Sequence, residues 1–247
     1  MSMPDLIYNS SFKDKTLYLN IKTVTEYPTF TKFNNDKKYS SEKWVEMAER
    51  RYGVSPEDHH NLNKFYQEKA CYLPEFSKII GVAFGGYSNE KEEFIFKSFV
   101  KPDEIELIKT FNKVLDNTET QKGKDAILCG HNMGYIISTI SKRVVKHREK
   151  GVTIPNLFVH NIHAKPWEQR VVDTVDLWKF GGNEYMGLDV IAEFMGFGYE
   201  PSIVNINENY WGINDPSEAD SFNNSLKEQM EYELLLLTNI VSEIKKL

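Results

Sequence analysis

Two polar side chains alternate along an apolar segment near the start of the chain. The segment 17–24 has the alternating character of a β-strand, and Asn20 and Lys22 lie two positions apart in it. Both therefore project from the same face of the strand. An ammonium beside an amide can bind a phosphate group without a metal ion. Alternatively, Lys22 extends to solvent or pairs with Glu233, near the other end of the chain.

A second polar pair, His131 and Asn132, directly follows the apolar segment 125–130, which we predict to be a buried strand. The ends of strands often carry functional groups in α/β proteins. These side chains are therefore candidates for contacts with a nucleic acid. The alternative is a local role, in which Asn132 caps the helix that follows and His131 forms a hydrogen bond nearby.

The elements that must position these residues follow from hydrophobic periodicity. Strands are predicted at 17–24, 77–86, 93–100 and 125–130, and helices at 42–51, 56–70, 102–115, 133–144, 187–197 and 226–244. The turn-rich residues 85–89 indicate a hairpin between the second and third strands. Three early strands followed by alternating helices and strands predict an α/β fold with a mixed sheet.

The composition is that of a globular protein: 247 residues, of which 40% are hydrophobic and 13% aromatic, enough to bury a full core. The net charge of −6 argues against broad, nonspecific binding to nucleic acid, which relies on clustered Lys and Arg. Cys71 and Cys129 are far apart in sequence, and we expect free thiols in a reducing compartment. The N-terminal residues lack the basic start and apolar run of a signal peptide. We therefore expect a cytoplasmic protein.

Five segments taken together resemble one family. In chain order they are LNIKTV (19–24), EKACYLPEFSKII (68–80), GHN (130–132), KPWE (165–168) and VDTVDLWKFG (172–181). They are similar to segments of the predicted 3′–5′ exonucleases related to the exonuclease domain of family B DNA polymerases, within the DnaQ-like, ribonuclease H-like superfamily. The resemblance implies a single ribonuclease H-like domain over 1–247. That domain would have a central mixed sheet flanked by helices and a helical insertion at 27–70, after the first strand.

Members of this superfamily hold two divalent metal ions, Mg²⁺ or Mn²⁺, with four acidic residues. One ion activates a water and the other stabilises the leaving oxygen during phosphodiester cleavage. The resemblance puts Asn20 and Lys22 at the positions of an Asp and a Glu on the first strand, and Ile137 at the position of an Asp after the GHN segment. Gln229 and Glu233 correspond to a Tyr and an Asp on the last helix. Of the four acids, Glu233 alone is retained.

This substitution pattern opposes metal binding. Four carboxylates supply four negative charges, whereas the corresponding residues here sum to zero because Lys22 and Glu233 cancel. A lysine ~4 Å from a dication would cost roughly 8 kcal/mol at an effective dielectric of ~20, about the binding energy of a micromolar ligand. We therefore expect no metal cofactor. The chain would be a catalytically inactive pseudo-exonuclease that binds single-stranded nucleic acid or a protein partner.

Two alternatives stay open. In the first, the fold is reused as a structural or protein-interaction module, which an exposed apolar patch would favour. In the second, the chain is an active metal-dependent exonuclease whose acids are displaced to positions such as Glu26, Asp173 or Glu231. Asp173 is otherwise expected to be a turn or capping residue. Trp167 and Trp178 are expected to anchor a core or an interface.

Overall fold

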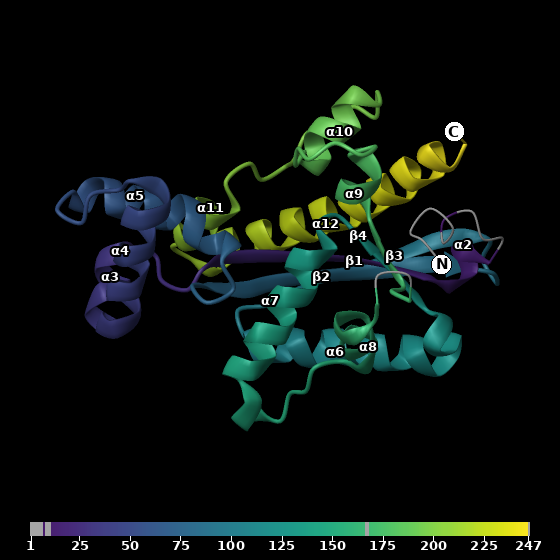
Figure 1. The fold of residues 1–247 in the computed structure, drawn as a ribbon, viewed down its shortest axis with the longest axis horizontal. Helices are drawn as coiled ribbons and strands as arrows, with labels where there is room; N and C mark the ends of the chain where they lie inside the picture. The colour runs from purple at the N-terminus through teal and green to yellow at the C-terminus, as the bar shows by residue number, and fades with distance from the viewer. Residues whose placement is uncertain (1–6, 8–10, 166–167, 247) are drawn as a thin grey trace. The chain divides into compact units, whose positions relative to one another are not determined.

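The strands form one five-stranded mixed sheet, in the order β3-β2-β1-β4-β5 (Figure 1). The computed structural model describes residues 7, 11–165 and 168–246. Its strands are β1 (Thr16–Thr25), β2 (Ser77–Ser88), β3 (Glu93–Val100), β4 (Ile127–Gly130) and β5 (Val171–Asp173). The β2–β3 pair is antiparallel, and the β1–β4 and β4–β5 pairs are parallel. The predicted α/β fold with a mixed sheet is confirmed.

Helices occupy most of the remaining chain. They are α2 (Phe12–Lys15), α3 (Phe30–Asp36), α4 (Lys38–Tyr52), α5 (His59–Lys69), α6 (Glu104–Lys122), α7 (Met133–Lys146), α8 (Asn156–His163), α9 (Thr174–Trp178), α10 (Leu188–Phe194), α11 (Ile206–Trp211) and α12 (Pro216–Lys245). Each predicted helix is present, but α12 begins ten residues before the predicted start at 226. The sequence did not predict β5, α8, α9 and α11, because elements of three to eight residues are too short to show a clear period.

The parallel strand β4 lies in a continuously apolar segment. All four residues of β4 are buried, and Leu17 and Leu128 are register partners in the β1–β4 pair. Parallel strands that are covered on both faces lose the alternation of polar and apolar residues. The β2–β3 hairpin differs from the prediction, because β2 continues through the glycines to Ser88, which pairs with Glu93.

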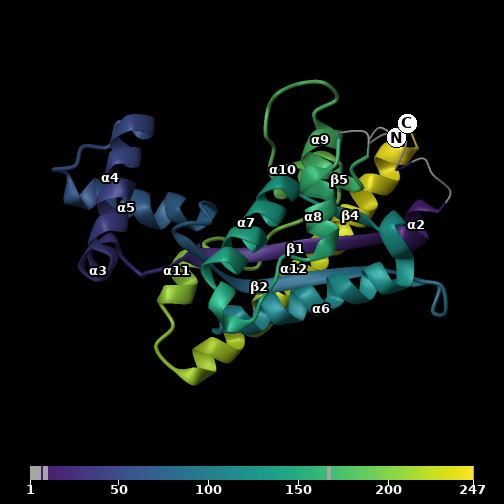
Figure 2. The same ribbon diagram turned by 60° about the horizontal axis from the view of Figure 1, so that its bottom comes forward.

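Helices cover both faces of the sheet. Figures 1 and 2 show α6 and α7 on one side of β1 and β2, and the C-terminal part of α12 on the other. The packing against α7 uses its predicted stripe, in which Met133, Ile136, Ile140 and Val144 are all buried. On the opposite face, a Cβ at Gly81 of β2 would lie 2.8 Å from Sδ of Met230. The absence of a side chain at this glycine therefore lets α12 approach the sheet closely.

The chain divides into two compact units. The first takes the described residues of 1–22, 80–203 and 223–247. The second takes 23–79 and 204–222, so it includes the predicted helical segment 27–70, which contains α3, α4 and α5. The inclusion of 204–222 was not predicted. The assignment of the chain to one domain stays a prediction.

The second unit has a core rich in aromatic side chains. Its buried residues are Phe30, Phe33, Trp44, Ala48, Leu62, Tyr66 and Ala70. The rings of Phe33 and Tyr66 stack with their centroids 5.2 Å apart. Asn207 of α11 joins the two stretches of this unit, because its Oδ1 accepts from the amide of Thr25 at 2.8 Å and its Nδ2 donates to the carbonyl of Gln67 at 3.0 Å.

Both cysteines are free thiols, as predicted, and both are buried. Within the described ranges, no helix combines the length and the apolar character that crossing a bilayer would require. Trp167, predicted as an anchor, and Pro166 of the KPWE segment lie outside the described residues.

Candidate functional site

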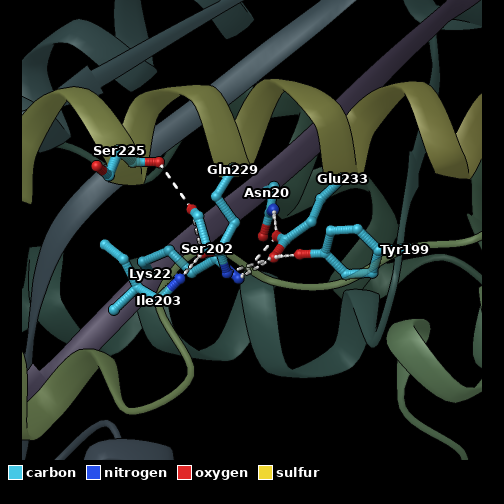
Figure 3. Close-up of polar contacts among 8 residues, drawn as sticks. All are labelled: Asn20, Lys22, Tyr199, Ser202, Ile203, Ser225, Gln229 and Glu233. Atoms are coloured by element: carbon cyan, nitrogen blue, oxygen red, sulfur yellow. Dashed lines mark hydrogen bonds and ion pairs between the residues drawn. The ribbon is translucent and has the colours of Figure 1, made fainter.

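The site begins with the face of β1 that carries Asn20 and Lys22. Residues two apart on a strand share a face, and Figure 3 shows both side chains directed toward α12. On that helix, Gln229 and Glu233 are four residues apart and so lie one turn apart on the same face. All four side chains belong to the first compact unit. The structure thus brings together four of the five residues that the sequence assigned to the degenerate catalytic positions.

Glu233 is at the centre of this group (Figure 3). Nζ of Lys22 lies 2.7 Å from each of its carboxylate oxygens. Asn20 donates from Nδ2 to Oε2 at 2.5 Å. Tyr199 donates from its hydroxyl to Oε1 at 2.8 Å, and Gln229 donates from Nε2 to the same oxygen at 3.0 Å. We call these five residues the Glu233 network.

A short loop extends the network on the Gln229 side. Oε1 of Gln229 accepts from the amide of Ile203 at 2.9 Å and from the hydroxyl of Ser202 at 3.2 Å. The hydroxyl of Ser202 also lies 3.4 Å from the carbonyl of Ser225 on α12. The side-chain amide of Gln229 therefore connects Glu233 to the backbone of the loop. Its Nε2 donates to Glu233, and its Oε1 accepts from the loop.

The electrostatics keep Glu233 ionised. Burial is the largest influence and acts to raise its pKa, but the nearby ammonium of Lys22 and the hydrogen bonds from Lys22, Gln229 and Tyr199 together hold the pKa below its usual value. Burial, reinforced by the negative charge of Glu233, raises the pKa of Tyr199 well above that of a free tyrosine. Tyr199 therefore remains a protonated donor. The network is a buried carboxylate balanced by one ammonium.

The residues present do not fit a pair of divalent metal ions. Such ions need several hard oxygen ligands and surrounding negative charge, and here Glu233 supplies one carboxylate, whose two oxygens already accept from four donors. Ile137, the fifth residue that the sequence assigned to these positions, lies half-buried on α7 and adds no charge. Among the described residues, no group of three or more His, Cys, Asp or Glu side chains is arranged to hold a metal ion.

The other predicted site residues have local partners. Asn132 is the N-cap of α7, with a φ of 61°, and its side chain accepts from the amide of Tyr135 at 3.3 Å. Nδ1 of His131 lies 2.9 Å from the hydroxyl of Thr174. Burial lowers the pKa of His131 to about 4, so its imidazole is neutral at physiological pH. These contacts match the local alternative that the sequence left open for both residues.

The acids named as displaced catalytic groups have separate roles. Asp173 accepts from the backbone amides of Asn132, Met133 and Val175 at 2.8, 2.6 and 3.0 Å, which agrees with its expected role as a capping residue. Burial nevertheless raises its pKa. Glu231 accepts from the hydroxyl of Ser98 at 2.6 Å. Glu26 belongs to the second compact unit.

Two members of the site were missed in the sequence. Tyr199 and Ser202 lie between α10 and α11, in a stretch without helical or strand periodicity. Sequence spacing therefore gave no signal that would connect them with β1. Their roles depend on how this loop passes over α12.

No protein-family model matches the chain, and a search of curated proteins finds no match.

Proposed function

We propose that this chain is a catalytically inactive relative of the 3′–5′ exonucleases, with a ribonuclease H-like fold, and that it acts by binding a protein partner. One observation carries the loss of catalysis. Nζ of Lys22 lies 2.7 Å from both oxygens of Glu233, the single acid at the positions where the family would have four. The ammonium of Lys22 holds the charge balance that metal ions would otherwise supply.

The topology supports the ribonuclease H-like part of the proposal. Three early strands, β1 to β3, lie side by side in the sheet, and β4 and β5 follow in parallel pairing with β1 and with each other. This mixed sheet with helices on both faces agrees with the fold that the five resembling segments imply. The contacts between β1 and α12 also agree with that fold. Asn20 and Lys22 of β1 donate to Glu233 of α12, which also accepts from Gln229 of the same helix.

A protein partner is favoured over a nucleic acid. Lys22, the candidate phosphate contact, has its ammonium engaged by Glu233, and Asn132 and His131 are engaged by Tyr135 and Thr174. Binding a phosphate at Lys22 would require breaking a buried ion pair, which is costly. The net charge of −6 also opposes the approach of a polyanion.

A nuclease assay tests the loss of catalysis. The purified chain and its Glu233→Gln variant are incubated with single-stranded DNA and RNA in Mg²⁺ or Mn²⁺, and the products are separated by length. We expect no shortening by either protein. Metal-dependent digestion by the unmodified chain that disappears in Glu233→Gln would contradict the proposal, because a contaminating nuclease would be present in both preparations.

A binding assay tests the choice of partner class. Anisotropy of labelled single-stranded DNA is measured with the unmodified chain and with Lys22→Met. We expect weak and equal binding by the two proteins. Affinity that falls about tenfold or more in Lys22→Met would instead identify Lys22 as a phosphate contact.

A further inference from the structure

An apolar patch lies on the segment that contains α9 and α10. Phe180 and Phe194 are 67% and 79% exposed, and Val190 is 45% exposed. The ring of Trp178 joins them, with its centroid 6.1 Å from that of Phe180 and 5.4 Å from that of Phe194. Val190 and Phe194 are four residues apart on α10, so they lie on the same helix face. We call Trp178, Phe180, Val190 and Phe194 the apolar patch.

The support beneath the patch is fixed by packing. On the opposite side of α10, Ala192 is fully buried in a small cluster with Tyr199 and Leu236, the last of these on α12. Tyr199 in turn donates to Glu233. Figure 1 shows α10 standing away from the sheet, beyond α9. Side chains of this size are usually buried in a protein that has no partner, so their exposure on a fixed support points to a docking surface.

The charged side chains of this segment indicate which charge a partner would carry. Exposed carboxylates at Glu184, Asp189 and Glu193 lie on the same stretch of chain as the patch. Lys179 of this segment forms an ion pair with Asp176, with Nζ 2.9 Å from Oδ1. Within the described chain, no ion pair neutralises Glu184 or Glu193. A partner that covers the patch therefore gains from positive charge, whereas a nucleic acid would be repelled.

We propose that the apolar patch binds a basic, amphipathic segment of a partner protein. Apolar side chains of that segment would cover Phe180, Val190 and Phe194, and its Lys or Arg side chains would face Glu184 and Glu193. This inference rests on the proposed function, since it names the partner of a protein that acts by binding. The patch lies on the segment that contains α9 and α10, whereas the proposed loss of catalysis concerns β1 and α12. An experiment can therefore contradict the peptide-binding proposal without contradicting the loss of catalysis, and the reverse.

The test uses a labelled synthetic peptide of Leu and Lys with amphipathic helical spacing, and a matched peptide in which Glu replaces Lys. Binding to the full chain is measured by fluorescence anisotropy. We expect the Lys peptide to bind more tightly than the Glu peptide. Phe180→Ala combined with Phe194→Ala should weaken Lys-peptide binding about tenfold or more. Glu184→Lys combined with Glu193→Lys should reverse the preference between the two peptides.

Two matched controls separate this surface from nonspecific attraction. Tyr39 is 73% exposed and belongs to the second compact unit, so Tyr39→Ala removes an exposed ring elsewhere. Glu42→Lys with Glu49→Lys on α4 changes the net charge by the same amount as the reversal at Glu184 and Glu193. We expect near-normal peptide binding by both controls.

Four results would overturn the inference. The first is unchanged peptide binding in the Phe180 and Phe194 double variant. The second is an equal effect of the α4 charge reversal on peptide binding. The third is a dimer of the unmodified chain in analytical ultracentrifugation that this double variant abolishes, because the occupant would then be a second copy. The fourth is binding of single-stranded DNA that the same variant abolishes. Nuclease activity of the chain would contradict the proposed function and leave the peptide result standing.

Discussion

Two buried carboxylates in the first compact unit can be compared, because each is balanced by a different kind of cation. Glu104, at the start of α6, is 7% exposed and accepts from Nε and Nη2 of Arg143 at 2.8 and 2.5 Å. Nε2 of His147 lies 2.8 Å from the same carboxylate. Glu233 is 6% exposed and has Lys22 as its cation, with the remaining donors neutral. Neither carboxylate is left without a charge partner.

The difference lies in how firmly each cation is held. Arg143 is 2% exposed and forms a two-pronged contact, which fixes both geometry and charge. The side chain of Lys22 is 18% exposed, and its ammonium is a point charge without a fixed orientation. The Glu104 cluster ties α6 to α7 and is a structural ion pair. The Glu233 network has the same charge balance, and it lies at the positions where the resemblance predicts a catalytic centre. This site therefore has the electrostatics of a structural ion pair.

We expect the largest loss of stability when the Glu104 cluster is disrupted. Arg143→Met removes the two-pronged partner of a deeply buried carboxylate and should lower the free energy of unfolding by about 3–5 kcal/mol. Urea unfolding followed by tryptophan fluorescence measures it. A loss below about 1 kcal/mol would mean that His147 balances Glu104 by itself, and the comparison with Glu233 would no longer hold.

A second experiment restores carboxylates to the Glu233 network. Asn20→Asp with Lys22→Glu places three acids together without a cation, so this variant should be less stable than the unmodified chain when metal is absent. Mn²⁺ should then stabilise it, by about 2.7 kcal/mol when the free ion is one hundred times above its Kd. The unmodified chain is the control and should show no such shift in Tm. If Mn²⁺ leaves the variant unchanged, these positions do not form a metal site, and the family assignment of the residues is wrong.

Removing the ammonium of Lys22 should lower the stability by a smaller amount. Lys22→Met leaves Glu233 with its neutral donors Asn20, Gln229 and Tyr199, so we expect a loss of about 1–3 kcal/mol in the free energy of unfolding. The direct test is whether this loss is smaller than that of Arg143→Met in the same urea experiment. Equal or larger destabilisation would show that Lys22 is held as firmly as Arg143.

The smallest effect is a change in the pH dependence of stability. Since the folded state holds the pKa of Glu233 below its ordinary value, because of the Lys22 ammonium and the hydrogen bonds that it accepts, ionised Glu233 stabilises the fold at pH values above that ordinary pKa. This contribution disappears as the pH falls through the lowered pKa. The unmodified chain should therefore be more stable than Glu233→Gln near neutral pH, and this difference in stability should narrow as the solution is acidified through the lowered pKa. A difference that stays constant on acidification would rule out a lowered pKa.

The sequence predicted the elements that have a long, regular pattern. The apolar stripe of α7 and the alternation in β1 and β3 each gave bounds within a few residues of those observed, because burial of one face imposes the period. It also predicted, through the resemblance, that three acidic positions are replaced, since Asn20, Lys22 and Ile137 cannot act as carboxylates whatever their surroundings. The sequence did not predict the short elements β5 and α9, because tertiary contacts rather than a local pattern stabilise them. It did not predict the grouping of 204–222 with 23–79 for the same reason.

The residue types alone specify the chemistry available at the site: one carboxylate, one ammonium and neutral amides. They leave open whether Lys22 meets solvent, a phosphate or Glu233. The packing of the fold resolves this, because Lys22 and Glu233 are 211 positions apart and meet when α12 packs on the sheet. The same packing brings in Tyr199 from a loop without periodicity. A buried charge needs its partner within a few ångströms, and that distance is set by how the elements pack.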